Sequence, residues 1–207
     1  MRNATLLLVP ALLLAATRPP PDVSPAGAQP ERSELHERVE RLRSGIERAD
    51  SVYRAEVEPL TTMLATFSDD SAFVRTLALA LVGAGRDAGL DPRLLTAVLL
   101  VENPWLDPAA RSPVGAVGLL QVMPFHAGRW GCPGSDLEDI ATNLCHGARL
   151  LRTLVDRSGG DMERALLRYN GCVRGRNTSD CHLYPAKVYA RAGEVLVRRW
   201  LDVSSSP

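Results

Sequence analysis

Apolar residues recur at helical spacing over much of the chain, which predicts a fold made mainly of α-helices. The helix that we expect at residues 91–102 begins with Asp91 as its N-cap and Pro92 in its first position. Pro104 disfavours helical geometry at the residue before it, so this helix should end at Glu102. Its apolar face is marked by Leu94, Leu95, Val98 and Val101.

Capping signals predict further helices on either side of this one. The run Asp69-Asp70-Ser71 can cap a helix that ends near Gly89. Ser135 and Glu138 have the spacing of a capping box, which predicts the start of a long helix ending before Ser158. The remaining expected helices run from 162 to 170, after a cap at Asp161, and onward from Tyr184.

The first 28 residues have the pattern of an export signal and the start of a spacer. Arg2 precedes an apolar run over residues 6–16 that is too short to span a bilayer comfortably. Cleavage could follow Ala16 or Ala28, and an uncleaved N-terminal anchor is the alternative. Five prolines over residues 17–30 predict an extended, disordered spacer.

Residues 31–60 are strongly charged, with apolar residues that alternate by four and three positions. A short coiled coil or a partner-binding helix is one interpretation. We prefer an amphipathic helix that lies on the surface of the chain's own domain. The apolar positions are Leu35, Val39, Leu42, Ile46, Ala49 and Tyr53.

These patterns divide the chain into four parts. The export signal and the start of the spacer occupy residues 1–28, and the rest of the spacer with the charged helix occupies 29–70. A single helical domain follows at 71–201, and a disordered tail is expected at 202–207. The 24 basic and 24 acidic residues balance. The overall charge therefore gives no support to a nucleic-acid partner.

Glu102 is the strongest candidate for chemistry because it should point where the apolar face of its helix points. Burial disfavours the charged form of a carboxyl group, and so does the negative end of a helix dipole. Both effects raise the pKa, as a general acid near neutral pH requires. The plainer interpretation is a surface glutamate that turns to solvent. Gly115 and Gly118, beside Gln121, suit a backbone that comes close to a ligand.

A family resemblance becomes specific at this point. Glu102-Asn103, followed by Ser-Pro-Val-Gly-Ala-Val-Gly-Leu-Leu-Gln-Val-Met-Pro at residues 112–124, closely resembles the soluble lytic transglycosylase family. That family is glycoside hydrolase family 23, with a lysozyme-like fold. Its usual pattern is Glu-Ser, a short loop, then Ser-x-x-Gly-Ala-x-Gly-Leu-Met-Gln-x-Met-Pro. Here Asn103 replaces the usual serine, and the loop after it is one residue longer than the commonest form.

Later segments extend the resemblance over roughly residues 72–200. Asn143-Leu144 with Gly147 matches the family's long helix, and the segment beginning at Tyr184 resembles its closing Tyr-x-x-x-Val. Residues 168–172 keep the family's Tyr-Asn pair but move the glycine that follows it.

The resemblance implies an exported enzyme that acts on peptidoglycan in the periplasm or outside the cell. Such an enzyme cleaves the β-1,4 bond between N-acetylmuramic acid and N-acetylglucosamine and leaves 1,6-anhydro ends. It implies Glu102 as the single acid and base, and neither a cofactor nor a metal. The implied substrate-binding residues, with Tyr169 also a candidate for placing Glu102, are Asn103, Gln121, Met123, Tyr169, Asn170 and Tyr184.

Two other functions stay open on the sequence. A hydrolase of the lysozyme or chitinase type on the same fold would need a second carboxylate, for which Asp107 is the candidate, although it could simply cap the loop beside Pro108. A weakly active peptidoglycan-binding or assembly protein could dock a partner, or itself, through residues 31–60. Trp105 could lie beside Glu102, stack on a sugar ring or pack in the core.

The four cysteines, an even number behind an export signal, predict two disulfides. Of the three possible connectivities we favour the pairing of neighbours, Cys132 with Cys145 and Cys172 with Cys181. Zinc binding is the alternative, because His146 and His182 each follow a cysteine, but no Cys-x-x-Cys spacing is present.

Overall fold

The computed structural model describes residues 29–172 and 180–205. The predicted export signal lies outside the described residues. Over the described part the protein is helical, and its β-structure is limited to two isolated bridges, which join Val117 to Arg111 and to Val122. The prediction of a mainly α-helical fold is confirmed.

The chain divides into two compact units, residues 1–45 and 46–207. The α-helices are α1 (Gln29–Val52), α2 (Glu58–Leu64), α3 (Ser71–Ala88), α4 (Pro92–Glu102), α5 (Ile140–Arg157), α6 (Met162–Tyr169) and α7 (Tyr184–Ser205). Short turns complete the order, a π-helix at Tyr53–Val57 and 3-10 helices at Pro124–His126 and Cys181–Leu183. Within the described residues, no helix is both long and apolar enough to cross a membrane.

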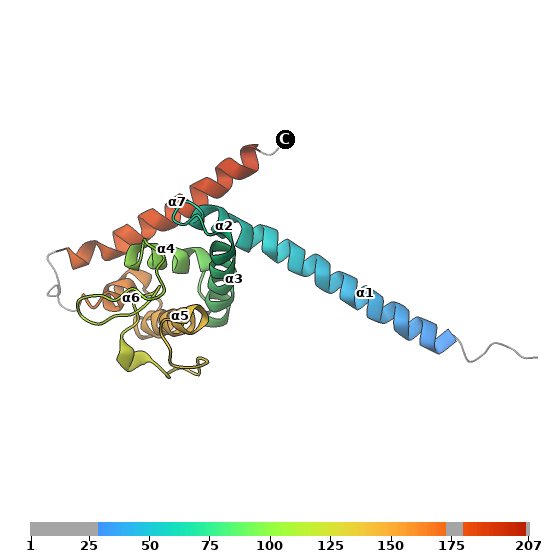
Figure 1. Cartoon of the computed structure of the whole chain (residues 1–207), viewed down its shortest axis with the longest axis horizontal. Coiled ribbons are helices and arrows are strands. Elements are labelled where there is room, and N and C mark those ends of the chain that lie inside the picture. The colour runs from blue at the N-terminus through green and yellow to red at the C-terminus, as the bar shows by residue number, and fades with distance from the viewer. Residues whose placement is uncertain (1–28, 173–179, 206–207) are drawn as a thin grey trace, which may run out of the picture. The chain divides into compact units, whose positions relative to one another are not determined.

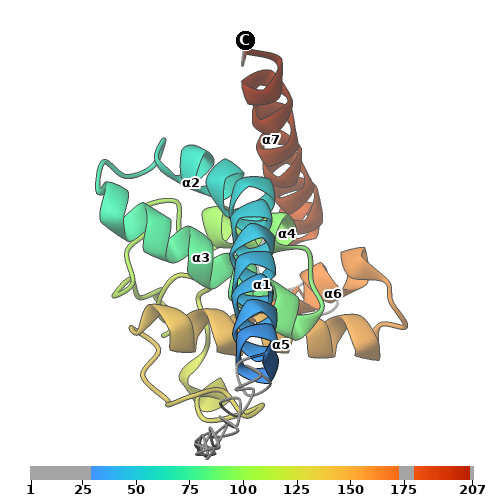
Figure 2. The same ribbon diagram turned by 90° about the vertical axis from the view of Figure 1, so that its right-hand side faces the viewer.

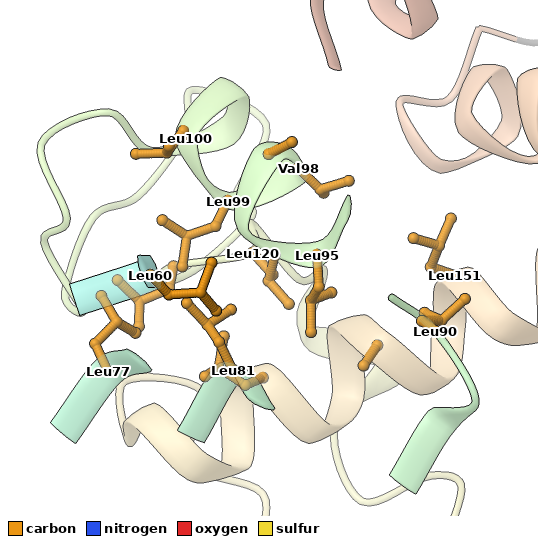
Figure 3. Packing of buried hydrophobic residues seen from close by; sticks show 14 of the residues in the cluster. Leu60, Leu77, Leu81, Leu90, Leu95, Val98, Leu99, Leu100, Leu120 and Leu151 are labelled. Atoms are coloured by element: carbon orange, nitrogen blue, oxygen red, sulfur yellow. The ribbon is translucent and has the colours of Figure 1, made fainter. Parts of the chain in front are cut away.

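Helix α4 is the centre of the second unit and lies between α7 and α5 in both ribbon views (Figures 1 and 2). It packs against α3 and α7, while α5 packs against α3 and α6. Figure 3 shows Leu60, Leu81, Leu95 and Leu99 gathered around Leu120. Full burial of each such side chain stabilises the fold by roughly 1.5–3 kcal/mol. The fully buried leucines include Leu60, Leu77, Leu81, Leu95, Leu99, Leu100, Leu120 and Leu151.

The predicted ends of the helices around the core are found where the capping residues stand. Asp91 caps α4 by accepting a hydrogen bond from the Arg93 amide at 2.8 Å, and α4 ends at Glu102. Asp70 caps α3 in the same way, and Gly89 follows α3 with a φ of 64°. These boundaries depend on local contacts of the backbone, which sequence patterns can predict.

The predicted capping box at Ser135 and Glu138 is wrong. Helix α5 begins later, and Asp139 is its N-cap, with its carboxylate accepting from the Thr142 amide at 2.8 Å. Asp136 accepts from the Glu138 amide, so the segment before the helix is a separate turn.

The predicted bounds of the helical domain, 71 and 201, stay a prediction, and the compact unit that contains this domain extends beyond them. The second unit begins at Ile46, because the π-helical turn and α2 contribute Val57, Leu60 and Leu64 to the buried core. At the other end, α7 continues to Ser205, so residues 202–205 are helical rather than a disordered tail. No glycine or proline interrupts the helix there, since Pro207 comes later.

Helix α1 begins at Gln29, so the last two residues of the expected spacer are already helical. In residues 29–45, the side chains of Leu35, Val39 and Leu42 are 61%, 50% and 68% exposed. The interpretation of this helix as one that lies on the domain's surface stays a prediction.

Two glycines within helices, Gly147 of α5 and Gly83 of α3, provide a test of how tightly α5 packs against Leu120. A Cβ at Gly147 would lie 2.7 Å from the Leu120 Cβ, whereas a Cβ at Gly83 would have no atom within 4 Å. We expect Gly147→Ala to destabilise the protein by about 1–3 kcal/mol through overpacking. Gly83→Ala should stabilise it by up to about 1 kcal/mol, since alanine favours the helix. Chemical denaturation of both variants measures the difference, and equal effects would contradict the tight contact.

Candidate active site

Glu102 is the last residue of α4 and is partly buried. Its Oε1 accepts a hydrogen bond from the Tyr184 hydroxyl at 2.6 Å. Tyr184 is the first residue of α7 and is buried, so this bond joins the end of one core helix to the beginning of another. The packing of α4 against α7 therefore determines the position of the carboxyl group.

The environment of Glu102 makes its carboxyl group a weaker acid than an exposed glutamate. Burial raises its pKa from the ordinary value of 4.5 to about 7, and the hydrogen bond from Tyr184, which favours the charged form, limits this rise. Near neutral pH, the protonated and ionised forms are both well populated. One group can then donate a proton and later accept one.

Tyr169 is a candidate for placing Glu102, but its hydroxyl has a different hydrogen-bond partner. Its hydroxyl donates to the carbonyl oxygen of Leu120 at 2.8 Å. Burial, and then the negative charge of Glu102, raise the pKa of Tyr169 well above its usual value, so its hydroxyl stays protonated. The structure therefore gives the direct contact with the carboxyl group to Tyr184, while Tyr169 holds the loop that contains Leu120.

The loop that contains Leu120 is attached to α5 by the buried side chain of Asn143. The Asn143 Oδ1 accepts from the Leu120 amide at 2.8 Å, and its Nδ2 donates to the carbonyl oxygens of Val117 and Leu137 at 2.9 and 2.8 Å. Val117 and Val122 exchange two backbone hydrogen bonds of 3.0 Å, which close the turn between them. Buried polar groups require such partners, so Asn143 specifies where this turn lies.

Gly118 shows why glycine is needed inside this turn. Its φ is 78°, and a Cβ added to it would lie 2.3 Å from the Asn143 Nδ2. Its carbonyl oxygen accepts from the Asn103 Nδ2 at 3.3 Å and from the Gln121 Nε2 at 2.8 Å. The close approach that the glycine pattern predicted is therefore an approach to Asn143 within the protein.

Asn103 is 2% exposed, and its side-chain amide bonds to the backbone. Besides Gly118, it donates to the Asp107 carbonyl oxygen at 2.7 Å, and its Oδ1 accepts from the Asp107 amide at 3.2 Å. These contacts give Asn103 a structural role beside Glu102. Its contact with substrate stays a prediction, as does that of Gln121, which is partly buried and has a φ of 47°.

Two other residues of the loop after Glu102 are now placed. Trp105 is 85% exposed, which rules out the expected alternative of core packing. Asp107 is exposed, and its Oδ1 accepts from the Ala109 amide at 2.9 Å. That contact matches the cap beside Pro108 that we considered as its simpler role.

Met123 and Asn170 are both partly buried and lie at the ends of short elements. Met123 precedes the 3-10 helix that begins at Pro124, and Asn170 is the C-cap of α6. Gly171 follows with a φ of 72°, and the Cys172 amide donates to the Leu167 carbonyl oxygen at 2.8 Å. The displaced glycine thus ends α6 in an ordinary left-handed turn.

Both predicted disulfides are present, Cys132–Cys145 and Cys172–Cys181. Their sulfur atoms are therefore not available as zinc ligands. Among the residues that the structure describes, no three His, Cys, Asp or Glu side chains gather in a way that could hold a metal ion. The second disulfide links the end of α6, near Tyr169, to the turn that leads into Tyr184.

Sequence reasoning missed the face of α5 that holds the loop after Met123. His146 accepts from the Gly128 amide at 2.9 Å, and its Nδ1 contacts the Thr142 carbonyl oxygen at 2.8 Å. Arg149 donates to the Trp130 carbonyl oxygen at 2.7 Å. The signal that could have found this face is the spacing of Thr142, His146 and Arg149, which differ by four and three positions and so share one side of the helix.

Comparison with known proteins gives two matches to this region. Residues 82–179 match the family described as "Transglycosylase SLT domain". The chain is also 39% identical over 106 residues to a protein named "Transglycosylase" from Enterobacteria phage PRD1. That alignment covers 51% of this chain and 38% of the phage protein, so the chain matches well under half of this relative's length. The matched residues include Glu102, the turn around Gly118, and Tyr169. The match over residues 82–179 thus identifies a transglycosylase SLT domain in this chain.

Proposed function

We propose that the protein is an exported peptidoglycan lytic transglycosylase in which Glu102 is the acid and base. The observation that carries the proposal is a single carboxyl group at the end of a core helix, with a pKa raised by burial to about 7 and a bond from Tyr184. The match of residues 82–179 to the transglycosylase SLT domain supports the substrate class.

In the proposed first step, protonated Glu102 donates its proton to the oxygen between N-acetylmuramic acid and N-acetylglucosamine as the bond from that oxygen to C1 breaks. The 2-acetamido group of the substrate assists. In the second step, the C6 hydroxyl of the same N-acetylmuramic acid forms a bond to its C1 and gives its proton to the Glu102 carboxylate. The product is a 1,6-anhydro end, no water is consumed, and Glu102 is restored.

The neighbouring residues have proposed roles that fit their contacts. Tyr184 positions the carboxyl group and limits the rise of its pKa. Gln121, Met123 and Asn170 contact the sugars of the glycan strand. Tyr169 acts through the loop that it holds at Leu120.

Export to the periplasm or the cell exterior is part of the proposal. Two disulfides support it, because such bonds persist in oxidising compartments and are rare in the cytosol. The expected signal over residues 1–28 would direct it.

The first prediction concerns Glu102→Gln, tested by mass spectrometry of digested peptidoglycan. The wild-type protein should release fragments with 1,6-anhydro-muramic ends. The variant should lose at least about 100-fold in rate, the usual contribution of a general acid. Glu58→Gln, a change at an exposed glutamate of α2, is the matched control and should keep full activity.

Other products would change the conclusion. Reducing ends, which are heavier by one water, would identify a hydrolase, and Asp107→Asn would then be the next variant to measure. Absence of any product from folded wild-type protein would contradict the enzymatic proposal and favour a binding role.

Glu102→Gln should also change stability in a pH-dependent way. The folded-state pKa is raised from 4.5 to about 7, so the folded protein binds more protons than the unfolded chain between these values. Wild-type stability therefore falls as pH rises through this window, by on the order of 3 kcal/mol. Thermal unfolding should show the variant stabilised relative to wild type at pH 8 and not at pH 4. A variant that is less stable at both pH values would contradict the burial of a charge.

The hydrogen bond from Tyr184 to Glu102 can be tested by measuring how kcat/KM of Tyr184→Phe depends on pH. The bond from Tyr184 favours the ionised carboxyl group, so its loss should raise the pKa of Glu102 further. The alkaline limb of the kcat/KM profile should move to higher pH, because the acid form persists longer. Tyr189→Phe, at a tyrosine of α7 that is 45% exposed, should leave the limb unmoved. A limb that moves to lower pH in Tyr184→Phe would contradict the assignment.

A further inference from the structure

Two apolar surfaces of this chain have spacings that fit each other. The first is a stripe in residues 29–45 formed by Leu35, Val39 and Leu42, each at least half exposed. These residues alternate by four and three positions on a helix whose other faces are charged. That pattern is the seam of a coiled coil, and it stabilises a helix only when another surface covers it.

The second surface is an open groove of about 700 Å³ in residues 46–207. Ile46, Ala49 and Tyr53 line one side of it, and Leu79 of α3 lines the other. Ile46 is 70% exposed and Leu79 is 50% exposed, so the groove presents uncovered apolar side chains. Its helical side continues the heptad spacing of the stripe.

We propose that the groove of one copy of the chain receives the stripe of a second copy, with the two α1 helices antiparallel. Stripe and groove both lie along α1, and a helix face cannot fold back on the next turns of its own helix. The stripe in the groove must therefore come from another molecule. In this dimer a two-fold axis relates the two copies. Each copy therefore inserts its own stripe into the other's groove and receives the other's stripe in return.

The antiparallel register pairs the three apolar positions of the stripe with the three helical positions that line the groove. With Leu42 opposite Ile46 of the second copy, Val39 lies opposite Ala49 and Leu35 opposite Tyr53. In heptad terms each pair joins an a position to a d position, as antiparallel helices require, and small Ala49 faces the branched Val39. Sliding either helix by one heptad would leave apolar residues uncovered.

The charges beside the seam also favour the antiparallel arrangement. A parallel pair would place Arg38 opposite Arg43 of the other copy twice. The antiparallel pair places His36 beside Asp50 twice and Arg43 beside its own counterpart once. Asp50 lines the groove and already pairs with Arg54 at 3.0 Å, so its carboxylate is held where His36 would arrive.

Sedimentation equilibrium of the purified protein tests the association. Wild type should form a dimer whose population rises with concentration. Leu42→Glu should weaken the dimer by at least about tenfold, because it places a charge in the seam. Ser44→Glu adds the same charge at the heptad position farthest from the seam and should leave the dimer intact.

Engineered cysteines test the orientation, and all four native cysteines are already in disulfides. Mixed Val39→Cys and Ala49→Cys proteins should form a disulfide-linked heterodimer on mild oxidation. Each variant alone should cross-link poorly, since only a parallel pair brings identical positions together.

Three results would overturn the proposal. They are a wild-type monomer at all concentrations, equal dimerisation of Leu42→Glu and wild type, and efficient cross-linking of Val39→Cys with itself but not with Ala49→Cys. Peptidoglycan digestion by the same samples is a separate measurement, so failure of the dimer leaves the proposed enzyme unaffected.

Discussion

The carboxyl group of Glu102 is constrained from two sides, and much of the second unit is arranged around that constraint. Its backbone ends the helix at the centre of the core, and its side chain accepts a hydrogen bond from Tyr184 at the start of another core helix. Burial keeps water away from the carboxyl group and raises its pKa to about 7. The same packing that stabilises the unit therefore tunes the acidity of this carboxyl group.

That arrangement has a cost, because a partly buried carboxyl group destabilises the folded protein whenever it is ionised. The surroundings limit the cost with a single neutral donor instead of a cation. An arginine in the place of Tyr184 would lower the pKa and leave a permanent carboxylate. A tyrosine orients the group while the protonated form stays accessible, as the proposed role of Glu102 as both acid and base requires.

The turn around Gly118 depends on buried polar contacts rather than on apolar packing alone. Asn143 holds it to α5, Tyr169 holds it at Leu120, and Asn103 connects it to the end of α4. Each partner comes from a different helix or helix end. Removing one would leave a buried amide or carbonyl group unpaired, so the turn is specified as a unit. The turn in its fixed place also sets the backbone positions of Gln121, which lies within it, and of Met123, which follows it.

The sequence by itself determined the helical class, the ends of α3, α4 and α6, the neighbouring disulfide pairs and the candidacy of Glu102. Each of these depends on contacts within a few residues, on periodicity or on a resemblance in motif. Only the tertiary structure decided that Tyr184 meets Glu102, that Asn103 is turned into the loop, and that the compact unit begins at Ile46. Tyr184 and Glu102 are 82 residues apart along the chain. Contacts between such distant residues form only when helices pack, and packing depends on the shapes of many side chains at once.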